Sequence, residues 1–231
     1  MKIPGIIGGL GPETTADFYL KINHMAEEAG VDTRPACLVW NIPLPYELER
    51  KLLLTQAGLE EYIPYLRSAA KILEAAGADF LAVPCNTVHE VYEDYSSAVE
   101  IPVLHIVDET VDDLESNRIN DVALLATGQT ISGGMYQKKL KDRGINYVIP
   151  GKEDQQAINQ IVSRLVGSEK NEEDSEWIHS FIEHRVRGVG AILLACTDLH
   201  ILASEADVGI KVVDSMKILA RATFKLLAET N

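Results

Sequence analysis

The pattern of hydrophobic and polar residues contains one arrangement twice, about a hundred residues apart. It spans residues 77–89 (GADFLAVPCNTVH) and residues 188–200 (GVGAILLACTDLH). Each copy has a glycine, a short apolar run, a cysteine where the run stops, small polar residues, and a histidine four residues after the cysteine. Such an unbroken apolar run predicts a strand that is buried on both faces, as in parallel sheets. We therefore expect Cys85 and Cys196 at the carboxyl ends of two such strands.

The rest of the chain alternates predicted strands and helices. Strands are expected at residues 3–7, 37–40, 101–106, 122–127 and 210–214, and helices at residues 13–29, 64–76 and 155–166, around Trp177, and around Leu219. This alternation is typical of an α/β fold with mainly parallel sheets, and the repeat indicates two similar Rossmann-like domains. The first domain takes residues 1–104 plus 210–231, because we expect the terminal strand and helix to return to it. The second takes residues 105–209.

The two repeated cysteines are the candidate catalytic residues. In open α/β sheets, ligands bind at the carboxyl ends of the strands, which is where the pattern puts both thiols. A single cysteine there is as often an inert, buried hydrophobe, but that interpretation does not explain the matched positions. Cys37 lies in an apolar run without such a repeat and is assigned to the core. Three cysteines in a chain of this kind indicate free thiols.

Two loops at strand ends and one arginine are candidate anion sites. The loop of residues 8–12, which includes Gly11, presents backbone N–H groups before a helix, but it lacks the third glycine of a dinucleotide fingerprint. A small carboxylate, or a plain tight turn, fits it better than a nucleotide. Thr127 and Thr130 lie in a second loop, typical of a carboxylate site or of an N-capped turn. Arg50 follows a strand end and could bind a carboxylate or be a solvated surface residue.

Composition narrows the possible partners. The chain has 21 Lys and Arg against 35 Asp and Glu, a net charge of −14, which opposes binding to nucleic acid or to anionic membranes. No apolar run approaches the ~20 residues that span a bilayer, and the first residues lack the apolar core of a signal peptide, so we expect a cytoplasmic protein. The negative charge also repels anionic substrates, so a carboxylate site must rely on local donors.

At these residues the chain resembles the aspartate/glutamate racemase family, the cofactor-independent amino-acid racemases, and within it the aspartate racemases. The resemblance covers nearly the whole chain, and its motifs are residues 6–12 (IIGGLGP), 84–87 (PCNT), 125–127 (LAT) with Thr130, and 195–198 (ACTD). It implies two domains related by a pseudo-twofold axis that face each other across an active-site cleft, with one catalytic cysteine from each. It also implies a small amino-acid substrate, no cofactor, no metal and a homodimer.

The resemblance also assigns residues to the substrate. Asn86, Thr87, Thr127 and Thr197 hold the α-carboxylate, and Arg50 looks like the arginine that binds the side-chain carboxylate of aspartate. Gly11, Thr130 and Asp198 complete the substrate-binding set, with Asp198 orienting the ammonium group or the Cys196 loop. The chain departs from aspartate racemases where they often carry a lysine two residues before a helix-ending glycine: here Leu165 occupies that position, with Arg164 beside it. The resemblance predicts aspartate as the substrate, with glutamate as the alternative, and Leu165 leaves the side-chain specificity open.

Two thiols suit the inversion of an α-carbon. One base removes the proton from one face while an acid supplies a proton to the opposite face, and the two groups exchange roles in the reverse direction. With each sulfur roughly 3 to 3.5 Å from its reacting partner, the sulfurs should lie about 6 to 8 Å apart. We expect the N-terminus of the following helix to lower the thiol pKa below about 8.5. His89 and His200 could tune the thiols, but surface or helix-turn positions are expected for them; no PLP-lysine motif or metal-ligand spacing is present.

Three alternatives stay open at this point. A racemase of broad amino-acid specificity, a hydantoin racemase, or a cis-trans isomerase of a small dicarboxylate such as maleate could use the same cysteine pair. A Cys-His hydrolase would need only one of the two motifs. A non-catalytic amino-acid-binding protein could use the same cleft without either thiol.

Overall fold

The computed structural model describes residues 1–167, 169, 171–186, 188–202 and 209–229, and in them the chain forms two parallel sheets. The first has the order β2-β1-β3 and the second the order β5-β4-β6-β7. The strands are β1 (Pro4–Gly8), β2 (Leu38–Asn41), β3 (Phe80–Ala82), β4 (Asp121–Ala126), β5 (Asn146–Val148), β6 (Ala191–Ala195) and β7 (Lys211–Asp214). The predicted α/β class with two sheets is confirmed.

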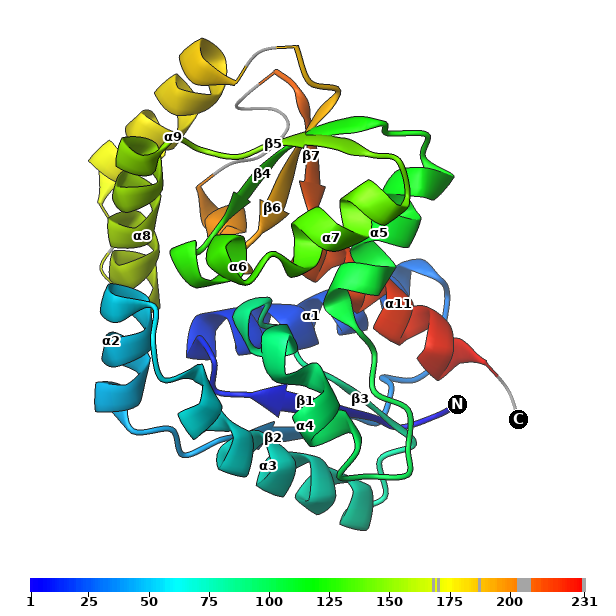
Figure 1. Ribbon diagram of the computed structural model, residues 1–231. Helices are drawn as coiled ribbons and strands as arrows, with labels where there is room; N and C mark the ends of the chain where they lie inside the picture. The colour runs from blue at the N-terminus through cyan, green and yellow to red at the C-terminus, as the bar shows by residue number, and fades with distance from the viewer. Residues whose placement is uncertain (168, 170, 187, 203–208, 230–231) are drawn as a thin grey trace.

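The helices connect these strands, as parallel pairing requires. Those of the first half are α1 (Pro12–Glu28), α2 (Tyr46–Thr55), η1 (Leu59–Tyr62), α3 (Ile63–Ala75), η2 (Thr87–Val91) and α4 (Tyr92–Ser96). The others are α5 (Ile106–Ser116), α6 (Gly128–Gly133), α7 (Met135–Asp142), α8 (Lys152–Val166), α9 (Glu172–Arg185), η3 (Leu199–Ile201) and α11 (Ser215–Ala228). Figure 1 shows the two sheets above one another, with α2 meeting α8 at one side of the molecule.

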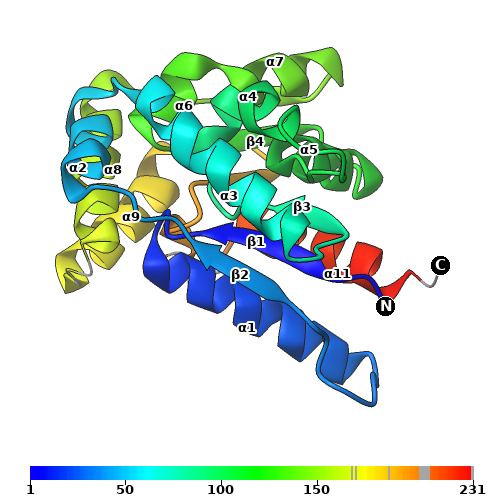
Figure 2. The same ribbon diagram turned by 90° about the horizontal axis from the view of Figure 1, so that it is seen from below.

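Each sheet is covered on both faces, which explains the unbroken apolar strands. All residues of β1 and β6 are buried, because successive side chains point to opposite faces and both faces carry helices. On β1, Ile7 packs into a core with α3, while Ile6 packs into a different core with α1. Figure 2 shows α1 and α3 on opposite sides of the first sheet. The outer face of the second sheet carries α8 and α9.

A shared layer of helices joins the two halves. Side chains of α1, α5, α7 and α11 form one continuous core with strands of both sheets, and α11 packs against both α1 and α5. Phe18 of α1, Leu114 of α5 and Leu219 of α11 are fully buried in this core. Burial of large apolar side chains is the dominant favourable term in folding, so this layer fixes the two halves against each other.

Two strand predictions differ from the structure. We expected the terminal strand to join the first half, but β7 pairs in parallel with β6, with Ile192 opposite Val212, so it extends the second sheet. Helix α11 alone turns back to pack on α1. The strand expected at residues 101–106 is reduced to one bridge between Leu81 and Val103, and its neighbour Pro102 has no N–H to donate to a ladder. No helix among the described residues is long and apolar enough to cross a membrane.

Candidate active site

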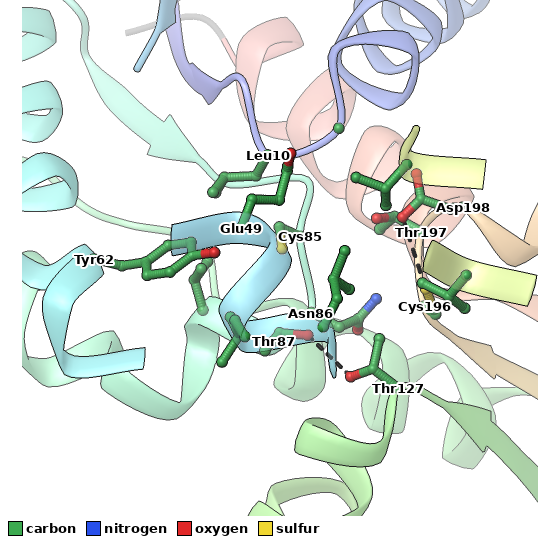
Figure 3. A pocket seen from close by; sticks show the side chains of 16 residues that line it. Leu10, Glu49, Tyr62, Cys85, Asn86, Thr87, Thr127, Cys196, Thr197 and Asp198 are labelled. Atoms are coloured by element: carbon green, nitrogen blue, oxygen red, sulfur yellow. Dashed lines mark hydrogen bonds between the residues drawn. The ribbon is translucent and has the colours of Figure 1, made fainter. Parts of the chain in front are cut away.

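The ends of the two repeated strands meet at one small inner cavity. Cys85 lies three residues beyond β3, Cys196 follows β6 directly, and both line a cavity of about 60 Å³. Cys85 is partly exposed to this space, whereas Cys196 is buried. Figure 3 shows them on two sides of the cavity, each from a different half of the chain. The fold therefore brings together the two thiols that the sequence repeat singled out.

Burial sets the protonation state of both thiols. It raises the pKa of Cys85 to about 12, an effect that nearby negative charges reinforce and that the backbone N–H groups of Val88 and Thr87 oppose. Burial raises the pKa of Cys196 well above its ordinary value, and the charge of Asp198 adds to this. We expected helix N-termini to lower these pKa values. The backbone N–H groups do act in that direction, but removal of the thiols from water outweighs them.

His89 supports the Cys85 loop from behind. Its Nδ1 lies 2.8 Å from the carbonyl oxygen of Cys85, so the Nδ1–H tautomer donates a hydrogen bond there. The ring is buried against Tyr92, Tyr95 and His105, and burial lowers its pKa to about 3. Of the two settings expected for His89, a surface or a helical turn, it takes the second, because it lies in η2. A neutral, buried His89 holds the backbone rather than exchanging protons with solvent.

Three threonine hydroxyls gather at one side of the cavity. Thr87 from the first half lies 3.1 Å from Thr127 and 3.2 Å from Thr130, oxygen to oxygen. Thr127 is also the N-cap of α6, since its hydroxyl accepts a hydrogen bond from the backbone N–H of Thr130. Thr87 and Thr127 line the cavity, whereas Thr130 is buried behind them and positions both. This arrangement offers hydroxyl donors to a carboxylate, with one partner from each half.

Asn86 has a structural task that the sequence did not reveal. It lines the cavity, yet its Oδ1 accepts a hydrogen bond of 2.6 Å from the Tyr136 hydroxyl and its Nδ2 donates one of 3.0 Å to Ser215. Both partners lie beyond residue 105, so Asn86 ties the Cys85 loop to α7 and α11. One amide proton stays available for a ligand.

Asp198 lies at the other side of the cavity beside Cys196. Its Oδ1 accepts a hydrogen bond of 2.6 Å from the Thr14 hydroxyl at the start of α1. Gly11 precedes that helix with φ of 93°, and a Cβ there would lie 3.2 Å from the Asp198 carboxylate. Only glycine tolerates both this conformation and this approach. Gly11, Thr197 and Asp198 all line the cavity.

Arg50 lies apart from the inner cavity. Its side chain is exposed and lines a larger outer pocket of about 790 Å³ between the loop after β2, helix α2 and the end of α8. Leu165, in place of the expected lysine, is buried in the core under α8, and Arg164 pairs with Asp174. Among the described residues, no Lys, Arg or His side chain lines the inner cavity.

Sequence reasoning missed Glu49 and Tyr62. Both line the inner cavity near Cys85, and Figure 3 shows Glu49 and the Tyr62 hydroxyl on the Cys85 side. Burial raises the pKa of Glu49, with a further contribution from the charge of Asp198. One signal was available: Glu49 shares a helix face with Leu52 and Leu53, three and four residues on.

His200 takes a peripheral position. Its Nδ1 lies 2.5 Å from the carbonyl oxygen of Thr197, and its Nε2 lies 2.9 Å from the carboxylate of Asp17 on α1. It thus fixes the Cys196 loop to α1 and does not line the inner cavity. Cys37 packs against the core shared by the two halves, as predicted, and burial raises its pKa to about 11. Among the described residues, no group of three His, Cys, Asp or Glu side chains is placed to hold a metal ion.

Comparison with known proteins agrees with this architecture. The sequence profile of the Asp/Glu/hydantoin racemase family matches residues 7–223, and the chain belongs to this family. It is 30% identical to the broad-specificity amino-acid racemase RacX of Bacillus subtilis (strain 168) over 223 residues, which is 95% of each chain. The resemblance noted in the sequence is therefore confirmed.

Two solved structures have the same fold over their full length. The aspartate racemase of Picrophilus torridus superposes with a TM-score of 0.83 at 29% identity, covering 100% of this chain and 96% of that one. An aspartate racemase homologue from Pyrococcus horikoshii OT3 gives a TM-score of 0.81 at 30% identity, covering 99% and 100%. The two-domain racemase fold is thus shared from end to end.

Proposed function

We propose that this protein racemises free amino acids by a two-base mechanism in which Cys85 and Cys196 act on opposite faces of the α-carbon. The observation that carries the proposal is the inner cavity, where the two thiols come from the ends of strands in different sheets. Family membership and the likeness to RacX support the reaction class.

In the proposed reaction, the thiolate of one cysteine takes the α-proton and becomes a thiol. The C–H electrons move into the substrate carboxylate, and the opposite thiol then delivers its proton to the other face and becomes the thiolate. Hydroxyl donors such as Thr87 and Thr127 suit the carboxylate, because they stabilise the negative charge that develops on it. The net result is inversion, with one thiolate and one thiol before and after.

Because burial raises the pKa of both thiols, the proposal includes a substrate that helps to form the working thiolate. An α-ammonium group that enters the cavity brings a positive charge beside both sulfurs, and a nearby opposite charge favours the ionised form of a thiol. Asp198 is the proposed partner of this ammonium group, because it lies beside Cys196 in the cavity. Neither step uses a cofactor or a metal ion.

The aspartate specificity predicted from the sequence depends on Arg50. The exposed position of Arg50 at the outer pocket does not add support to that prediction. The relative RacX is named for broad specificity. We therefore propose amino-acid racemisation without restriction to aspartate.

The proposal is tested by incubating purified protein with L-amino acids in heavy water. The protein is treated beforehand with a metal chelator and with a carbonyl reagent that removes PLP. Expected products are D-isomers that carry deuterium at the α-carbon, resolved by chiral chromatography and mass spectrometry. If no D-isomer forms from any acidic, neutral or basic amino acid, the proposal is wrong.

We also propose that the protein is a homodimer in the cytoplasm. Exposed apolar side chains on the edge strands support an interface: Val39 and Trp40 on β2, and Tyr147 and Val148 on β5. Light scattering should give twice the mass of one chain. The mass of a single chain in dilute buffer would contradict the dimer.

A further inference from the structure

Three side chains line both the inner cavity and the outer pocket: Glu49 and Leu53 from α2, and Val166 from α8. They mark the passage between the two spaces. The inner cavity, at about 60 Å³, is small beside the outer pocket of about 790 Å³, so it suits the ammonium, α-carbon and carboxylate of an amino acid rather than a whole long substrate. The side chain of a bound amino acid must therefore extend through this passage, past Glu49.

The walls of the passage are apolar apart from that one carboxylate. Its other two walls are Leu53 of α2 and Val166 of α8, and beside it Leu52 and Val162 line the inner cavity, where Tyr62 adds one hydroxyl. Among the described residues, Glu49 has no ion-pair partner, and burial together with the charge of Asp198 raises its pKa. An uncompensated carboxylate in a poorly solvated place favours a cation beside it.

The surroundings oppose an acidic side chain. A second carboxylate leaving the inner cavity would meet Glu49 before it reached Arg50, which is exposed in the outer pocket with Glu169 on the same lining. Repulsion between Glu49 and the side-chain carboxylate of a ligand would discriminate strongly against acidic amino acids. A long, flexible basic side chain fits the passage instead. Its methylene stem packs on the apolar walls, while its charged end stays free to pair with Glu49.

We infer that Glu49 is a specificity-determining residue that selects amino acids with a cationic side chain, of the lysine, ornithine and arginine class. Its carboxylate pairs with the side-chain ammonium or guanidinium, and Leu52, Leu53 and Val166 contact the stem. The inference rests on the proposed racemase function and deepens it. Aspartate and glutamate become poor substrates for the same reason.

The test compares L-lysine with L-2-aminoheptanoate, in which a methyl group replaces the lysine ammonium. Racemisation is followed by chiral chromatography for wild type, Glu49→Gln and Glu49→Asp, with L-ornithine, L-arginine and L-aspartate as further substrates. In wild type, kcat/KM for lysine should exceed that for the neutral analogue by at least about tenfold. Glu49→Gln should bring this ratio to about one by lowering kcat/KM for lysine alone. Glu49→Asp should give an intermediate ratio.

Glu47→Gln is the matched control, since Glu47 is exposed on the same helix and lines neither space. It should leave the ratio unchanged. An equal loss for both substrates in Glu49→Gln would show that Glu49 binds the α-ammonium or acts on Cys85, and would overturn the inference. Preference of the wild type for aspartate or for the neutral analogue would also overturn it, while leaving the proposed reaction intact. Absence of racemisation with every substrate would instead refute the reaction itself.

Discussion

The hydroxyl of Thr14 donates a buried hydrogen bond of 2.6 Å to Oδ1 of Asp198, across 184 positions of the sequence. It joins the first turn of α1 to the loop that carries Cys196. Because Asp198 is buried and burial raises its pKa, this hydroxyl is one of the few groups that stabilise the carboxylate. The loop that carries Cys196 is thus held in part by the first half of the chain.

Replacing Thr14 should show how much this bond contributes. Thr14→Val keeps the shape but leaves a buried carboxylate without its donor, so we expect the free energy of unfolding to fall by about 1.5–3 kcal/mol. Thr14→Ser, which keeps the hydroxyl, should lose much less. Urea denaturation measures both, and equal losses for the two variants would contradict a role for the hydrogen bond.

The two-base mechanism predicts matched effects for the two cysteines. Cys85→Ser and Cys196→Ser should each abolish net racemisation, because a serine hydroxyl is far less acidic than a thiol. Each variant should still exchange the α-proton of one enantiomer, the one whose proton faces the remaining thiol. Proton NMR in heavy water follows this exchange, with Cys37→Ser as the control. A Cys196→Ser protein that converts L to D at nearly the wild-type rate would refute the mechanism.

The raised thiol pKa values predict a rising pH profile. With the pKa of Cys85 at about 12 and that of Cys196 also raised, both thiols of the free enzyme are protonated at neutral pH. The thiolate fraction then grows about tenfold per pH unit well below the pKa, so kcat/KM should rise with a slope near one between about pH 7 and 9. Initial rates at low substrate concentration measure it. A flat profile over this range would mean that a thiolate is already present in the free enzyme.

His89 should make stability fall in acid. Its folded pKa of about 3 lies below the ordinary value of 6.5, so its contribution to stability is complete above pH 6.5 and is lost as the pH falls from there towards 3. Linkage gives a loss of about 1.6 kcal/mol between pH 6.5 and 5 from this residue alone. In His89→Asn, whose amide still donates to Cys85 but does not titrate, the loss should be smaller by that amount. Denaturation of wild type and His89→Asn at both pH values tests this. The contributions of His105 and of the carboxylates cancel, because both proteins contain them. Equal losses of stability in the two proteins would contradict the prediction.

Arg50→Ala should have little effect on neutral amino acids. The side chain is exposed and lines only the outer pocket, so kcat/KM for alanine should stay within about threefold of wild type. Any larger effect should be confined to substrates whose own carboxylate reaches that pocket. Measuring alanine and aspartate side by side decides this, and an equal large loss for both would assign Arg50 a structural task.

Some features of this protein follow from local patterns alone. The strands before Cys85 and Cys196 are unbroken apolar runs after a glycine, and such runs are typical of strands that are buried on both faces of a parallel sheet. Because the same run occurs twice with a cysteine at its end, the sequence by itself determined which two thiols line the inner cavity. The glycine loop and Pro12 likewise determined where α1 begins.

Other features depend on contacts between distant segments, and only the tertiary structure decided them. The sequence pattern of β7 suits either sheet. In the structure β7 pairs with β6, and it shares a core with α11. In sequence Asn86 resembles a ligand-binding residue, yet in the structure its side-chain amide is hydrogen-bonded to Tyr136 and Ser215. Glu49 resembles a surface residue until α8 covers its helix. The direction of the thiol pKa shifts has the same origin, because the burial that raises these pKa values comes from segments distant in the sequence, which no local pattern encodes.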